Sequence, residues 1–153
     1  MAVWESGADA VADALETGLR LRLRRALRRV ESQHTQMREL LHELEEAVRQ
    51  GDPAAVRAPL GRLRDALAAH FDLEDQVLFP ALHGLSPGAR MGLEALSDQH
   101  RAFLGELAEM LAGKRVCDAD AVSQLHAAIG DHERREELLL EEVVDKAGLQ
   151  EAG

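Results

Sequence analysis

The sequence predicts an all-α protein, an up-down-up-down antiparallel four-helix bundle that follows a short N-terminal arm. Its 153 residues are rich in Ala, Leu, Arg and Glu, which favour helices, and no segment alternates apolar and polar residues as a half-buried strand does. Four long segments instead place apolar residues at alternating steps of three and four, which gives each helix one apolar face. Helices of this kind joined by short connections pack as antiparallel neighbours around one core.

Three short breaks divide the chain into these helices. In Gln50-Gly51-Asp52-Pro53, the glycine can end one helix and the Asp-Pro pair can cap and begin the next. Gly84-Leu85-Ser86-Pro87 has the same character, and in the third break, residues 113–120, Asp118 or Asp120 can serve as the N-cap. The predicted helices are 18–50, 53–83, 87–112 and 119–146, and the predicted parts are an arm at 1–17, a bundle at 18–147 and a C-terminal tail at 148–153. In the arm, Trp4, Val11 and Leu15 are candidate packing contacts.

The apolar face of each predicted helix can be read directly from the sequence. It consists of Leu23, Leu27, Val30, Met37, Leu41, Leu44 and Val48 in the first helix, of Val56, Leu60, Leu63, Leu67, Val77 and Ala81 in the second, of Leu93, Leu96, Phe103, Leu107 and Met110 in the third, and of Leu125, Ile129, Leu139 and Val143 in the fourth. We expect these side chains to form the bundle core.

Every apolar face is interrupted, and only by residue types that bind metals. The interrupting residues are His34, His70, Glu74, His100, His132 and Glu136. When the helices are folded back at the three breaks, these positions fall at one level to within about one residue, or ~1.5 Å of helix rise. Carboxylates and imidazoles without partners in an apolar interior cost several kcal/mol each, roughly, unless a cation compensates them. The layer therefore predicts a metal site that draws on all four helices.

The residues alone leave the metal open. Imidazole and carboxylate without thiolate suit iron, zinc, manganese or copper. Six donors exceed the four of a tetrahedral zinc site, whereas two metal ions bridged by Glu74 and Glu136 would use all six and leave positions open for a small ligand. The Glu-x-x-His pairs of ferritin-like proteins would have to lie on two helices, but here they occur only at Glu31/His34 and Glu39/His42 of the first helix. A metal-free network of internal ion pairs is the remaining alternative.

Composition excludes several other classes. The chain has 28 acidic and 18 basic residues, a net charge of −10, which argues against nucleic acid and acidic membrane surfaces as partners. Cys117 is the only cysteine, so no intramolecular disulfide can form, and a reducing compartment fits. The sequence contains neither a signal peptide nor an apolar run of membrane-spanning length, so we expect a soluble cytoplasmic protein of undetermined oligomeric state, with a homodimer as one option.

The chain resembles the hemerythrin-like proteins that carry the HHE cation-binding domain. The resemblance covers about residues 18–145 and rests on His34, on the run from His70 to Pro80 (HFDLEDQVLFP), on His100-Arg101, and on the run from His132 to Glu136 (HERRE). It implies a four-helix bundle around an oxo- or hydroxo-bridged di-iron centre, with zinc or manganese as possible substitutes. In this comparison the four histidines are terminal ligands, and Glu74 and Glu136 are the bridging carboxylates.

One departure bears on function. Oxygen-carrying hemerythrins have a second histidine one turn from the position of His100, whereas here Leu96 and Leu104 occupy both candidate positions. The resemblance is thus to the four-histidine proteins linked to oxygen, nitric oxide or iron sensing. We expect binding of, or reaction with, O2, NO or peroxide, without a protein nucleophile or general acid/base. A metal-dependent sensor or interaction module without turnover is the alternative, and a metal-free helical scaffold is a further one.

Other residues near these positions are assigned different roles. Glu137 is the second choice after Glu136 as a bridging carboxylate. It lies five residues after His132, and hemerythrins place an Asp at that distance from the histidine as the bridging carboxylate. Asp75 is expected to be a solvated neighbour. We expect surface or helix-end roles for His42, His83 and His126, and a solvated face for the arginines between Arg20 and Arg29.

Overall fold

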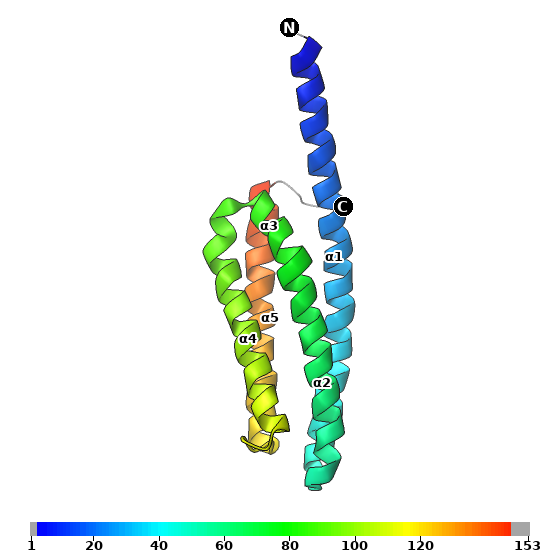
Figure 1. Ribbon diagram of the computed structural model, residues 1–153, viewed down its shortest axis with the longest axis vertical. Coiled ribbons are helices and arrows are strands. Elements are labelled where there is room, and N and C mark those ends of the chain that lie inside the picture. The colour runs from blue at the N-terminus through cyan, green and yellow to red at the C-terminus, as the bar shows by residue number, and fades with distance from the viewer. Residues whose placement is uncertain (1–2, 148–153) are drawn as a thin grey trace.

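The computed structural model describes residues 3–147, with side chains described for residues 17–146. Figure 1 shows long helices running side by side, and no strand occurs among the described residues, so the predicted all-α fold is confirmed. The elements are α1 (Val3–Arg49), α2 (Pro53–Leu73), a π-helical turn η1 (Glu74–Leu78), α3 (Phe79–Leu85), a 3₁₀ turn η2 (Pro87–Ala89), α4 (Arg90–Leu111) and α5 (Ala119–Ala147).

Four antiparallel columns form the bundle, and α2, η1 and α3 together make one of them. The helix α1 packs against α2 and α5, and α4 packs against the same two helices from the opposite side. At its N-terminal end α1 extends well beyond the rest of the bundle (Figure 1). None of the described helices combines the length and apolar character needed to span a bilayer.

The helix ends follow the turn chemistry of the sequence. Gly51 and Gly113 have positive φ values of 75° and 74°, which a residue without a Cβ adopts at little cost. Asp52 accepts a hydrogen bond from the backbone N–H of Ala54 at 3.0 Å and so caps α2. Asp118 accepts one from the N–H of Ala121 at 2.8 Å, which makes it, rather than Asp120, the cap at the start of α5.

The first helix is longer than predicted, because α1 begins at Val3 and not near residue 18. Residues 3–17 contain no proline and many good helix formers, and an isolated glycine such as Gly7 costs only about 1 kcal/mol within a helix. The contacts expected of Trp4, Val11 and Leu15 lie outside the residues whose side chains the structure describes. The division of the chain at residue 17 stays a prediction.

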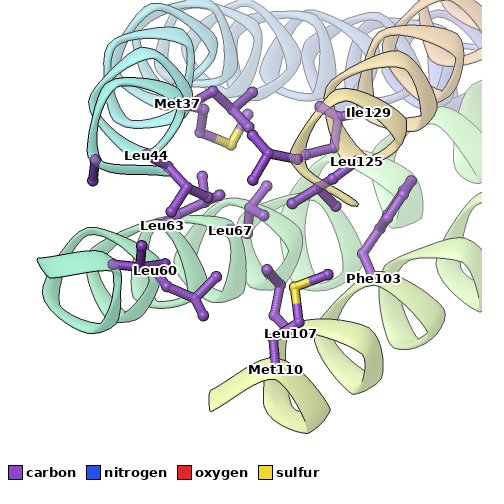
Figure 2. Packing of buried hydrophobic residues seen from close by; sticks show 14 of the residues in the cluster. Met37, Leu44, Leu60, Leu63, Leu67, Phe103, Leu107, Met110, Leu125 and Ile129 are labelled. Atoms are coloured by element: carbon purple, nitrogen blue, oxygen red, sulfur yellow. The ribbon is translucent and has the colours of Figure 1, made fainter. Parts of the chain in front are cut away.

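The buried apolar residues form two clusters along the bundle axis. The first lies toward the ends that carry the turns at residues 51 and 113 and contains, among others, Met37, Leu63, Leu67, Leu107 and Leu125. Figure 2 shows side chains of this cluster directed into the space between the helices. The second lies toward the opposite end and contains Val30, Leu78, Leu82, Leu93 and Val143. The predicted His/Glu layer falls between the two clusters.

The predicted apolar face of the second column is wrong after Glu74. Val77 is 43 % exposed and Ala81 only partly buried, whereas Leu78 and Leu82 are each 1 % exposed. The cause is the π turn η1, in which the N–H of Phe79 bonds to the carbonyl of Glu74, five residues earlier. A π turn takes one more residue than an α turn, so every later side chain is displaced by one position around the helix.

Candidate metal centre

The structure brings all six residues that interrupt the apolar faces into one buried layer. His70, Glu74, His100, His132 and Glu136 are buried, and His34 is half-buried. Their donor atoms form two groups in which all atoms lie within 4.8 Å of one another. One group contains Glu74, His100, His132 and Glu136, and the other contains His34, His70 and Glu136. Glu136 belongs to both.

The pair His100/His132 presents two nitrogen lone pairs to one point. Nδ1 of His100 donates to Asp75 Oδ1 at 3.1 Å, and Nδ1 of His132 donates to Gln99 Oε1 at 2.7 Å, since both oxygens can only accept. Both Nε2 atoms are therefore unprotonated when the rings are neutral, and they lie 3.0 Å apart. Two nitrogen ligands about 2.1 Å from one metal ion, at roughly a right angle, would have about this separation.

Aromatic side chains enclose this pair. The Phe71 ring stacks on His100 with centroids 4.0 Å apart and planes within 9°, and Phe79 lies on His100 at 5.5 Å. Phe103 meets His132 edge-on at 5.5 Å. These contacts fix the two imidazoles in an apolar surrounding, so the phenylalanines pack the layer rather than supply ligands.

The pair His34/His70 lies across the layer, with ring centroids 4.7 Å apart. Nδ1 of His70 donates to Gln33 Oε1 at 2.9 Å, which again leaves Nε2 unprotonated and directed into the layer. Nε2 of His34 is buried and has no hydrogen-bond partner. Within the described part of the chain, neither ring nitrogen of His34 makes a hydrogen bond.

The two carboxylates lie between the imidazole pairs. Oε1 of Glu74 is 3.0 Å from Nε2 of His70 and 3.3 Å from Nε2 of His100, so one oxygen reaches both pairs. Oε2 of Glu136 is 3.5 Å from Nε2 of His132. Each imidazole pair therefore has at least one carboxylate oxygen within 4.8 Å of its donor atoms.

Unpartnered polar atoms show that the layer suits a cation. Both carboxylate oxygens of Glu74, Oε2 of Glu136 and Nε2 of His34 are buried without hydrogen bonds. Each such atom costs roughly 1–3 kcal/mol when it stays unsatisfied. All of them are metal ligands by type, and all lie in the same layer, so a bound cation would satisfy them together.

Burial and mutual proximity set the ionisation of the layer. Burial, together with the neighbouring carboxyl of Glu136, raises the pKa of Glu74 to about 11. Burial alone would raise the pKa of Glu136 as well, but the adjacent His132 and Glu74 bring it to about 2. Burial lowers the pKa of His70 to about 3 and also lowers the pKa of His100. At neutral pH the two carboxyl groups therefore share one proton, held by Glu74, and these two imidazoles are neutral.

Metal binding should release about one proton per chain at pH 7, because the proton on Glu74 must leave when its oxygen becomes a ligand. The affinity should rise roughly tenfold per pH unit between pH 7 and 8, since the raised pKa of Glu74 makes proton competition stronger at lower pH. Titration calorimetry in two buffers of different ionisation enthalpy measures this release. A binding enthalpy independent of the buffer would contradict it.

Three hydrogen-bonding residues of the centre were not predicted as such. Gln33, Asp75 and Gln99 each orient a histidine through its Nδ1. The expectation that Asp75 is merely a solvated neighbour is wrong, since it also accepts a 2.6 Å hydrogen bond from Ser97. A signal was present in the sequence. Each of the three is adjacent to a candidate ligand and bonds to a histidine of another helix.

The remaining candidates lie outside the layer. Glu137 is exposed, so the structure favours Glu136 as the inward carboxylate. His42, His83 and His126 are exposed, as expected, and His126 pairs with Glu45 at 2.6 Å. The arginines of α1 at positions 22, 24, 25, 28 and 29 are exposed as well, in agreement with a solvated face.

Comparison with known families agrees with this geometry. Residues 25–144 match the family model described as Hemerythrin HHE cation binding domain, which spans most of the bundle and all six residues of the layer. Neither a curated protein nor a solved structure matches the chain. The chain belongs to the hemerythrin HHE cation-binding domain family, and its buried His/Glu layer is a metal-binding site.

Proposed function

We propose that the protein holds a di-iron centre and binds or reacts with O2, NO or peroxide there. The proposal rests on one observation. Two pairs of imidazoles lie on either side of two buried carboxylates, and these carboxylates have oxygens without a hydrogen bond. His34 and His70 would hold one ion, and His100 and His132 the other. Glu74 and Glu136 would contribute to both, which fits two ions better than one four-coordinate zinc.

When bound, ferrous iron supplies an open position for a diatomic or peroxide ligand and electrons for its reduction. The chain supplies orientation and an apolar surrounding. Phe71, Phe79 and Phe103 limit water around the His100/His132 pair, and no side chain of the layer is placed as a nucleophile. Leu96 is buried one turn from His100, so no imidazole from that position completes the coordination. This supports reaction or sensing over reversible oxygen carriage.

A sensing role without turnover is the second candidate, and one observation favours it. The layer takes donors from α1, α2, η1, α4 and α5 and separates the two apolar clusters. Occupancy or oxidation of the metal would therefore alter the packing of all four columns at once. A bundle that changes its helix packing with metal state can report that state to a partner.

Elemental analysis of protein expressed with added iron tests the proposal, together with optical spectra before and after anaerobic reduction. We expect about two irons per chain, one for each donor group, and near-ultraviolet absorption that reduction bleaches. Stoichiometric zinc would keep the site and remove the redox role. Absence of metal after reconstitution with ferrous iron would overturn the proposal.

Turnover distinguishes the two candidates. If the reduced protein consumes many equivalents of peroxide or O2 in the presence of a chemical reductant, the reactive role is supported. If it reacts once and changes only its melting temperature or oligomeric state, the sensing role is supported.

A further inference from the structure

The two imidazole pairs differ in burial and in the hydrogen bonds that hold their rings in place. His100 and His132 are 1 % and 3 % exposed, both Nδ1 atoms are hydrogen-bonded, and their Nε2 atoms already converge at 3.0 Å. In the other pair only His70 is held in this way, by Gln33, while His34 is half-buried and makes no hydrogen bond to a described residue. Glu136 belongs to both donor groups and Glu74 to the His100/His132 group alone, so the halves differ in their histidines and in the number of carboxylates close to them.

Asp75 is the residue that most distinguishes the halves. It bonds to Nδ1 of His100, while the residue before it, Glu74, places Oε1 at 3.3 Å from Nε2 of the same ring. Two consecutive residues of the π turn η1 thus reach the two nitrogens of one imidazole. Ser97 donates to the same Oδ1 of Asp75 at 2.6 Å and so holds the carboxylate in place from α4.

We propose that the two halves bind metal with unequal affinity and in a fixed order. The His100/His132 half fills first and retains its ion, and the His34/His70 half fills second and releases its ion first. Asp75 and Gln99 are positioning residues that create this difference. The inference deepens the proposed function and rests on it, since it concerns how the chain loads the same two ions.

The physical reason is preorganisation. A ligand ring already held in the binding geometry loses less rotamer freedom when the metal arrives, and an acceptor on Nδ1 makes Nε2 a better donor. Both effects act on His100 and on His132. In the other pair they act on His70 alone, because His34 makes no such hydrogen bond. The free ring of His34 must be ordered at the moment of binding.

Anaerobic titration of the metal-free protein with cobalt(II) alone measures the order, because the visible bands of cobalt report each ligand environment. We expect two successive steps with distinct spectra, the first saturating at about one ion per chain. Dialysis followed by elemental analysis should then leave the first ion bound and remove the second. Calorimetry supplies the two dissociation constants.

Variants assign each step to its half. Asp75→Ala should weaken the first step about 10–100-fold and leave the second nearly unchanged, and Gln33→Ala should do the reverse. Asp75→Asn, whose amide oxygen can still accept from Nδ1, should restore most of the first affinity. Asp72→Ala removes an exposed carboxylate three residues earlier on the same column and serves as the control without effect. Circular dichroism of the metal-free forms checks that each variant folds.

Three results would overturn the inference. They are two equal and independent steps in the unaltered protein, a first step that Asp75→Ala and Gln33→Ala weaken alike, or loss of the first ion in His34→Ala. In each of these cases the unaltered protein still binds two ions, so the proposed di-metal centre stands. If the unaltered protein binds no cobalt and no iron, the proposed function fails and the inference fails with it.

Discussion

The Glu136→Ala protein should bind fewer than one metal ion per chain, whereas the unaltered protein is expected to bind about two, one per donor group. Glu136 is the only residue that belongs to both groups, and with Glu74 it supplies all of the negative charge that the layer offers to cations. Removing it leaves the four imidazoles with a single carboxylate. Elemental analysis after reconstitution with ferrous iron and gel filtration measures the loss.

Two variants make this result interpretable. Glu137→Ala removes the adjacent, exposed carboxylate and should keep about two ions, as expected if only the inward residue is a ligand. Glu136→Gln keeps the side-chain volume, so a loss of metal in this variant cannot be caused by a cavity. If Glu137→Ala loses its metal while Glu136→Ala retains it, the inward residue has been misidentified.

The Leu78→Ala variant should lose about 2–5 kcal/mol of unfolding free energy, whereas Val77→Ala should change it by no more than about 0.5 kcal/mol. Leu78 is 1 % exposed inside the second apolar cluster, and Val77 is 43 % exposed. Truncation of the buried side chain removes apolar contacts and leaves a cavity. Urea unfolding of the metal-free proteins, followed by circular dichroism, gives both values.

This pair of variants also tests the π turn. An uninterrupted α-helix through residues 70–82 would bury Val77 and turn Leu78 away from the core, so the two costs would be exchanged. A larger loss for Val77→Ala than for Leu78→Ala would therefore contradict the structure. Metal-free protein is used so that the measured values report packing alone, because a bound ion would add its binding free energy to the unfolding free energy of each variant.

The sequence predicts the layer well because polar, metal-binding residue types occupy positions that the apolar pattern marks as buried. Apolar faces with steps of three and four define the interior, and a histidine or glutamate in such a face has no low-cost alternative to a partner. All six residues found by this reasoning lie within the layer. The breaks at residues 51–52 and near residue 118 were also predictable, since Gly51, Asp52 and Asp118 have local conformational preferences that do not depend on the rest of the fold.

The parts that could not be predicted depend on contacts between helices. Nothing local distinguishes a π turn from an α turn in Glu74–Leu78, because the extra residue is justified only by what Glu74 and Asp75 reach on α4. The role of Asp75 follows from the same turn. Gln33 and Gln99 are each adjacent to a candidate ligand in the sequence, but only the neighbouring column shows which histidine each of them faces.

The division of the interior has a consequence for cooperativity. Two apolar clusters separated by a polar layer have few apolar contacts with each other, so each end of the bundle can open as its own unit when the layer is metal-free. Ions bound as proposed would take ligands from every column and would connect the two ends at mid-height. Metal binding would then do more than stabilise the fold, because the two ends would open together in global unfolding and no longer one at a time.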